Sequence, residues 1–232
     1  MRILGIESSS LVASAAIVTD DILTAEYTVN FKKTHSQTLL PMIDEIVTMT
    51  ETELGSIDAI AVSGGPGSFT GLRIGSATAK GLGLALKKPL IHVPTVDALA
   101  YNLWGAKDLV CPIMDAKRNQ VYTGIYRMRG GMEAVKAQCA MDMGQLMEEL
   151  NELGEAVIFL GDGVPVYGEQ AESLAKIPIS FAPAHMNRQR AGAVAALGAV
   201  YYAQGKIETA AEHGPDYLRK SQAERERLGE SL

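Results

Sequence analysis

The segment IDAIAVSGGPGSFTGLRIGSATAKGLGLALK, residues 57–87, combines a strand, a glycine-rich turn and a helix. Its first six residues form an apolar run typical of a buried strand. The turn SGGPGSFTG follows at 63–71, and the helical pattern continues to Lys87 before Pro89 ends it. The backbone N–H groups of such a turn and the positive end of the helix dipole are suited to binding an anion. A tight turn that binds nothing fits the same residues equally well.

The helix in this segment is apolar or small on almost every side. A stripe of minimal side chains recurs at every fourth residue: Gly71, Gly75, Ala79 and Gly83. Its polar strip is narrow: Arg73, Ser76 and Lys80. A helix on the surface normally keeps one broad polar face, so this one is expected to be buried on two sides. Each interior glycine costs about 1 kcal/mol relative to alanine, which predicts that a second helix approaches closely enough to compensate.

Composition excludes several classes of protein. The net charge of −6 over 232 residues argues against a free-standing nucleic-acid binder. The only basic cluster, at 219–227, is interleaved with glutamates and is typical of a solvated helix end. Cys111 and Cys139 are too few and too isolated for a disulfide framework or a zinc site. Glu7 interrupts the first apolar run too early for a signal peptide, and no run is long enough to span a bilayer, so a cytoplasmic protein is expected.

The rest of the chain predicts two similar halves. Strands at 3–6, 14–18 and 22–28 form a meander, followed by a helix over 39–49, the segment described above, a strand at 90–93 and a helix over 96–104. From residue 109, strands at 110–114, 121–127 and 133–137 repeat this pattern, followed by a helix over 143–153, a strand at 156–160 and helices over 169–176 and 190–204. We therefore expect an α/β fold with subdomains at 1–108 and 109–214, the last helix packing back on the first, and a loosely held polar tail at 215–232.

No catalytic or metal motif is evident from spacing. The glycine turn lacks the Gly-Lys-Ser/Thr ending of a P-loop and the third glycine of a dinucleotide fingerprint. His35 is interpreted as a polar residue at a helix start, and His92 as a histidine of the core or sheet edge. Asp162, between two glycines, fits a turn as well as a ligand site. We expect no metal and no cofactor.

Four segments resemble the TsaB (YeaZ) family: MRILGIESS at 1–9, HSQTLLPMI at 35–43, SGGPGSFTGLRIGSATAKGLGLA at 63–85 and PDYLRKSQAE at 215–224. These bacterial proteins are partners in threonylcarbamoyladenosine modification of tRNA. The resemblance implies an actin/sugar-kinase/Hsp70-like (ASKHA) fold with two related subdomains. The same segments are similar to the catalytic paralogue TsaD, which carries a His-x-Glu-Gly-His metal motif after the equivalent of strand 90–93. Here that run is Thr95-Val-Asp-Ala-Leu99, which implies a member that kept the fold and lost the chemistry.

The resemblance also implies partners. The chain is expected to be a non-catalytic scaffold that binds TsaD through a helical bundle, with the small ATPase TsaE joining the pair and tRNA bound only through the complex. Without TsaD, the same surface is expected to pair two copies. The expected interface residues are Leu39, Leu40, Ile43, Val47, Gly71, Leu72, Arg73, Gly75, Ser76, Ala79, Lys80, Leu82 and Gly83. Vestigial phosphate-binding positions are expected at Ser8, Ser9, Gly64, Gly65, Gly67 and Ser68.

Two enzyme classes remain as alternatives. A metal-dependent peptidase would need ligands that the sequence does not show. A small-molecule kinase of the same fold would need an acidic catalytic residue and a second phosphate turn, for which Asp115 and the segment 161–163 are weak candidates.

Overall fold

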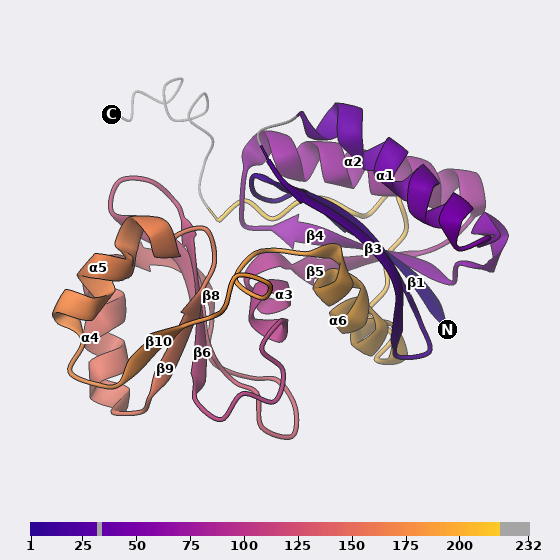
Figure 1. The fold of residues 1–232 in the computed structure, drawn as a ribbon. Coiled ribbons are helices and arrows are strands. Elements are labelled where there is room, and N and C mark those ends of the chain that lie inside the picture. The colour runs from indigo at the N-terminus through magenta and orange to yellow at the C-terminus, as the bar shows by residue number, and fades with distance from the viewer. Residues whose placement is uncertain (32–33, 219–232) are drawn as a thin grey trace.

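The computed structural model describes residues 1–31 and 34–218, and it contains two five-stranded mixed sheets (Figure 1). The basic cluster at 219–227 and most of the predicted tail lie outside the described residues. The first sheet has the order β3-β2-β1-β4-β5. Its strands are β1 (Arg2–Glu7), β2 (Val12–Thr19), β3 (Ile22–Asn30), β4 (Ala59–Gly65) and β5 (Leu90–Pro94). The first three strands pair antiparallel, and β4 and β5 continue parallel to β1.

The second sheet repeats this plan in the order β10-β9-β6-β7-β8. It consists of β6 (Leu109–Asp115), β7 (Gln120–Arg127), β8 (Glu133–Asp142), β9 (Val157–Leu160) and β10 (Ile179–Phe181). Strands β6 to β8 form an antiparallel meander, and β9 and β10 run parallel to β6. The predicted duplication of pattern is therefore present in the strand order of the two sheets.

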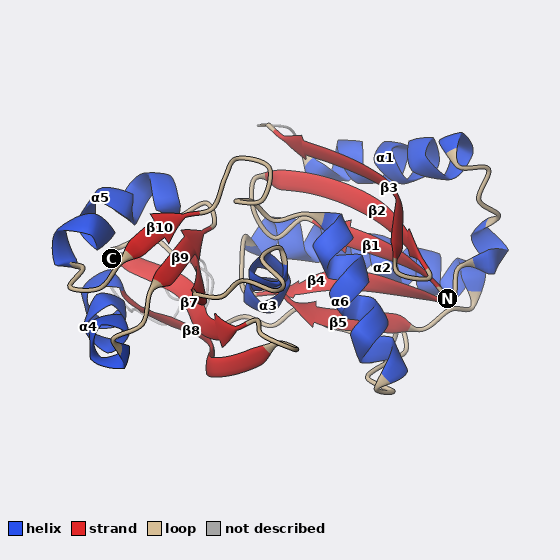
Figure 2. Cartoon of the chain, turned by 60° about the horizontal axis from the view of Figure 1, so that its bottom comes forward, coloured by secondary structure: helices blue, strands red, loops and turns tan. Residues whose placement is uncertain are grey.

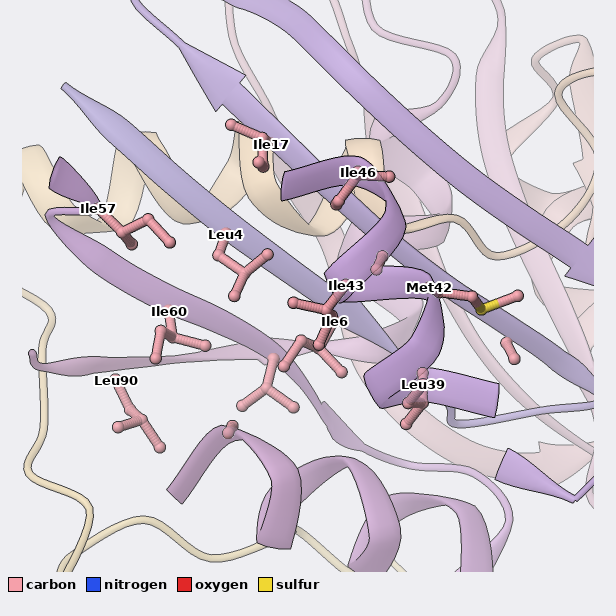
Figure 3. Packing of buried hydrophobic residues seen from close by; sticks show 14 of the residues in the cluster. Leu4, Ile6, Ile17, Leu39, Met42, Ile43, Ile46, Ile57, Ile60 and Leu90 are labelled. Atoms are coloured by element: carbon pink, nitrogen blue, oxygen red, sulfur yellow. The ribbon is translucent and has the colours of Figure 1, made fainter. Parts of the chain in front are cut away.

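Helices cover both faces of the first sheet (Figure 2). Helix α1 (His35–Met49) and helix α2 (Phe69–Leu86) lie on one face, with the short helix η1 (Leu54–Ser56) leading into β4. Buried residues of both helices pack there against β1, β2 and β4, around Leu4, Ile6 and Ile60 (Figure 3). Helix α6 (Ala191–Ala203) covers the other face, where its apolar residues pack on β1, β4 and β5. It approaches closely, since a Cβ on Gly198 would lie 2.6 Å from the Ala61 Cβ.

The second sheet is covered by α4 (Met143–Leu153) and α5 (Val164–Leu174). Between the subdomains lies α3 (Thr95–Tyr101), whose apolar residues Val96 and Leu99 pack with Val110 and Tyr126 of the second sheet. None of the helices formed by the described residues is both long and apolar enough to cross a membrane. The two halves are thus joined by an apolar contact through α3.

Three local predictions differ from the structure. Helix α5 begins at Val164 instead of residue 169, because Pro165 occupies its first turn, where a missing N–H costs nothing. Helix α1 begins at His35 instead of residue 39, with Thr34 at its N-cap position and Pro41 in its second turn. The part of the tail before residue 219 is not loosely held, since the Asp216 N–H donates to the Gly64 carbonyl at 2.6 Å.

Candidate functional site

The small-residue stripe of α2 faces the chain's own sheet. A Cβ on Gly71 would lie 2.0 Å from the Ser8 carbonyl oxygen, and a Cβ on Gly75 would lie 2.2 Å from Ser8 Oγ. At Gly83 the nearest atom is Leu90 Cδ1, at 2.4 Å. The expectation that these glycines meet a second pair of helices is therefore wrong. They allow the helix to approach the first sheet and the β1–β2 turn.

Other expected interface residues are also part of the chain's own interior. The buried ones are Leu39, Ile43, Leu72, Ser76 and Ala79. Lys80 is partly buried and donates from Nζ to the His213 carbonyl at 2.7 Å. Of the remaining expected residues, Leu40 and Arg73 are exposed, whereas Val47 and Leu82 are half-buried. The structure thus leaves only the outer side of the predicted interface open to a partner.

The outer side of α2 contains residues that the sequence reasoning missed. Ala77, Gly81 and Leu84 are exposed, and they follow Arg73 along one side of the helix. Leu84 is 70% exposed, and Met49, at the end of α1, is 75% exposed. Their spacing from Arg73 by four, eight and eleven residues was available in the sequence. The sequence alone does not single out this side, because the Gly71 stripe on the same helix is equally suited to close helix packing.

The expected phosphate-binding turn uses its polar groups within the chain. Ser8 Oγ donates to the Gly71 carbonyl at 2.9 Å, and the Ser9 N–H and hydroxyl both donate to Glu7 Oε1. The Ser68 N–H, at the start of α2, donates to the Ser9 carbonyl at 2.6 Å. Ser8 and Ser9 are almost completely buried. These donors, which an anion would need, are already satisfied.

The glycines of the turn at 63–71 are also in close contact with other parts of the chain. A Cβ on Gly64 would overlap the His92 ring, and a Cβ on Gly65 would lie 2.3 Å from the Asp216 carbonyl oxygen. A Cβ on Gly67 would lie 2.3 Å from the Ser9 carbonyl oxygen. The glycines of the turn therefore permit close packing of the chain on itself.

A cavity of about 530 Å³ lies between the two subdomains, at the carboxyl ends of the strands. Ser10, Gly67 and Ser68 line it from the first subdomain, and Asp115, Lys117 and Asp162 from the second. Lys117 is the only lysine or arginine among the described residues that line it, and its Nζ lies 2.5 Å from Asp115 Oδ2. This one cation is therefore already paired with a carboxylate.

Acidic groups dominate the electrostatics near this cavity. Burial raises the pKa of Asp162. It also raises the pKa of Glu7 to about 7, against the opposing effect of the hydrogen bonds from Ser9. For Asp115, partial burial is outweighed by hydrogen bonds from Lys117, and its pKa is lowered. Such surroundings are poorly suited to the phosphates of a nucleotide.

The positions expected to correspond to the TsaD metal motif, where this chain has other residues, carry structural contacts. Thr95 and Leu99 are buried, and Thr95 Oγ1 accepts a hydrogen bond from the Gly65 N–H at 3.1 Å. Asp97 accepts from Tyr126 Oη at 2.6 Å and from Tyr201 Oη at 3.2 Å, and burial raises its pKa. These contacts join α3, β7 and α6. His35 Nε2 lies 3.0 Å from the Val12 carbonyl, in keeping with a polar residue at a helix start.

Comparison of the sequence with known proteins identifies its family. The family model "TsaD: tRNA N6-adenosine threonylcarbamoyltransferase" matches residues 25–227. The "tRNA threonylcarbamoyladenosine biosynthesis protein TsaB" of Bacillus subtilis (strain 168) is 33% identical to this chain, covering 97% of this chain and 96% of the relative. The chain belongs to the TsaB family. The TsaB protein of Escherichia coli (strain K12) is 30% identical, and the match covers 96% of each chain.

Solved structures confirm the predicted fold of this TsaB family member. The structure titled "YeaZ from Pseudomonas aeruginosa" superposes with a TM-score of 0.80 at 23% identity, covering 93% of this chain and 99% of that one. The two related sheets and their helices give the predicted ASKHA-type α/β fold of two subdomains. The resemblance noted in the four sequence segments is thus confirmed at the level of family and fold.

Proposed function

We propose that this chain is a non-catalytic subunit that binds a TsaD-type protein through the outer sides of α1 and α2. In this role it supports the transfer of a threonylcarbamoyl group to adenosine in tRNA. Membership of the TsaB family, together with the names of its relatives, supports the pathway. The observation that carries the docking surface is the exposure of large apolar side chains on two neighbouring helices: Leu40, Met49 and Leu84.

Gly81 supports the same surface. No heavy atom lies within 4 Å of the position that its Cβ would occupy. A glycine in an exposed helix costs about 1 kcal/mol relative to alanine, and no packing contact of the described chain offsets this cost at Gly81. A partner helix that packs closely against this side of α2 would offset it, because glycine and the adjacent Ala77 allow two helix axes to come near one another.

The proposal that the chain is not catalytic is based on the residues at the positions where TsaD-type proteins are expected to bind metal and phosphate. Thr95 and Leu99 cannot replace imidazole ligands, and both are buried. The Ser8 and Ser9 hydroxyls are hydrogen-bonded within the chain. We further propose that a TsaE-type ATPase joins the complex, that tRNA binds only through it, that two copies pair when TsaD is absent, and that this takes place in the cytoplasm. The names of the TsaB relatives do not favour the peptidase or kinase alternatives.

The test compares matched substitutions on the two subdomains. Leu84→Glu and Gly81→Leu on α2 should abolish co-purification with TsaD and reduce tRNA modification in a mixture of this chain, TsaD, TsaE, tRNA and a threonylcarbamoyl donor. Val166→Glu is the control, because Val166 is 57% exposed on α5 of the other subdomain. It should leave binding and modification unchanged. Retention of TsaD binding by both α2 variants would refute the proposed surface.

Gly75→Leu, the substitution that the sequence analysis would favour, cannot test this interface. A side chain at Gly75 would enter the space of Ser8 Oγ inside the chain. Loss of binding would then report a damaged fold, whereas Gly81→Leu adds a side chain where the described chain leaves open space.

A further inference from the structure

Three residues that could bind a metal ion meet at the outer edge of the first sheet. His92 lies on β5, and Glu208 and His213 lie in the segment 207–217 that follows α6. This segment is tied to the edge strand, because Leu90 and Glu208 exchange two backbone hydrogen bonds of 2.9 Å. Lys80 of α2 holds it from the other side through the His213 carbonyl. The three side chains are therefore fixed close together by backbone contacts on either side.

His213 presents a ring nitrogen that has no hydrogen-bond partner within residues 1–31 and 34–218. Its side chain is 0% exposed, and its Nδ1 lies 2.5 Å from Glu208 Oε1. An ionised carboxylate only accepts, so Nδ1 carries the proton and Nε2 keeps its lone pair. Among the described residues nothing donates to the buried Nε2, which leaves an acceptor that a bound cation would satisfy.

His92 is in a similar state. Its Nε2 is buried and makes no aligned hydrogen bond to the described residues, although Asp216 Oδ2 lies 3.3 Å away. The two imidazole rings have their centroids 5.8 Å apart. Two imidazoles, one wholly buried and one half-buried, each with a buried nitrogen that lacks an aligned hydrogen bond, lie next to two carboxylates and match the ligand types that zinc selects in proteins.

We propose that His92 and His213, supported by Glu208, bind one Zn²⁺ ion. One ligand atom from each of the three residues lies within 4.8 Å of those from the other two. Ligand atoms around tetrahedral zinc are about 3.4 Å apart, so small side-chain rotations complete the site. Glu208 acts behind His213 and not as a ligand of the same ion: its carboxylate accepts from Nδ1–H and so fixes the ring with Nε2 toward the ion, a carboxylate–histidine arrangement common at zinc sites. Asp216 is in reach as a further carboxylate ligand.

The site has the features of a structural clamp. The His213 side chain is wholly buried, which leaves no open side for a substrate at that ligand. A cavity of about 320 Å³, lined partly by His92 and Glu208, gives the ion a route from solvent. Zinc here would fasten the segment 207–217 to β5. That segment also places Tyr217 against Phe69 at the start of α2, with ring centroids 4.5 Å apart. The proposed zinc site is separate from Thr95 and Leu99, which stand at the positions of the expected TsaD metal motif.

The experiment measures zinc directly and does not depend on TsaD. The chain is stripped with a chelator, dialysed against Zn²⁺, and analysed for metal per chain by mass spectrometry. We expect one zinc per chain, lost in His92→Gln and in His213→Gln and bound about 10-fold more weakly in Glu208→Gln. His185→Gln is the control, because His185 is exposed and outside the cluster, and it should retain the metal.

A second measurement uses the unaltered chain, in case a histidine variant fails to fold. Co²⁺ should give the visible absorption of a four-coordinate site, and Zn²⁺ should abolish it by displacement. Zinc should also slow proteolysis within 207–218. A chain that retains no zinc and gives no cobalt spectrum overturns the proposal. So does zinc that remains at full occupancy in both His92→Gln and His213→Gln.

Discussion

Gly75 tests whether the small-residue stripe exists for packing within the chain. Substitution by alanine places a Cβ 2.2 Å from Ser8 Oγ, about 1.2 Å closer than ordinary contact. Either the helix shifts, which costs about 1–3 kcal/mol, or the hydroxyl rotates and loses its bond to the Gly71 carbonyl inside a buried site, which costs about the same. Alanine regains about 1 kcal/mol of helix propensity. Gly75→Ala should therefore lower the free energy of unfolding by up to about 2 kcal/mol.

Removal of the Ser8 hydroxyl should reverse the sign of the stability change caused by Gly75→Ala. In a Ser8→Ala background, the nearest atom to the new Cβ is the Cβ of residue 8, at 3.5 Å, followed by Val62 Cγ2 at 3.7 Å. Both are ordinary contacts. Ser8→Ala alone costs about 1 kcal/mol for the lost hydrogen bond. Gly75→Ala added to it should then stabilise by up to about 1 kcal/mol, as helix propensity alone predicts.

Urea unfolding monitored by circular dichroism measures all four members of this cycle. Gly81→Ala is the matched control, on the same helix but in open space, and it should stabilise by up to about 1 kcal/mol. If Gly75→Ala has the same sign and size with and without the Ser8 hydroxyl, the packing explanation is refuted. Additivity would mean that the two side chains do not compete for the same space.

Three further predictions concern buried or paired groups. The pKa of Glu7 is raised to about 7 in the folded chain, so the folded state binds one more proton than the unfolded state between about pH 4.5 and 7. The free energy of unfolding should therefore fall as the pH rises through this window. Glu7→Gln should remove this pH dependence, measured as the midpoint of urea unfolding at each pH. Burial raises the pKa of the Cys111 thiol to about 12, so a disulfide reagent should leave it unmodified in the native chain, react only with the half-buried Cys139, and titrate both in denaturant. Glu26 accepts hydrogen bonds from the Arg190 guanidinium and from the N–H of Gly192, the latter at 2.8 Å. Glu26→Ala should therefore lower the free energy of unfolding by about 1–3 kcal/mol, and Glu26→Gln should lower it less. Equal stability of the two variants would contradict this.

Most of the fold could be predicted because its signals are local. Alternation of apolar residues marks strands such as 121–127, and the Ser68 cap and Pro89 bracket helix α2 within a few residues. The meander followed by parallel strands is visible twice along the chain. The short strand β10 was missed, because three residues carry too little pattern to be recognised. The resemblance of four segments also sufficed to assign the family.

The candidate site depended on contacts that local pattern does not contain. A stripe of glycine and alanine permits close approach to a sheet as readily as to another helix, and only the position of Ser8 and Leu90 shows that the sheet is the neighbour. The exposed side of α2 at Ala77, Gly81 and Leu84 follows from that orientation.

Sequence by itself determined the strand and helix pattern, the family and the acidic balance of this protein, because each is set by residues near one another or by composition. The tertiary structure alone decided which side of α2 faces outward and brought His92 beside His213, more than a hundred residues later. The physical reason is that periodicity fixes which residues share a face. The neighbour of that face is fixed by residues distant in the chain: Ser8 and Leu90 meet the inner side of α2. The backbone pairing of Leu90 with Glu208 after α6 brings His213 to His92.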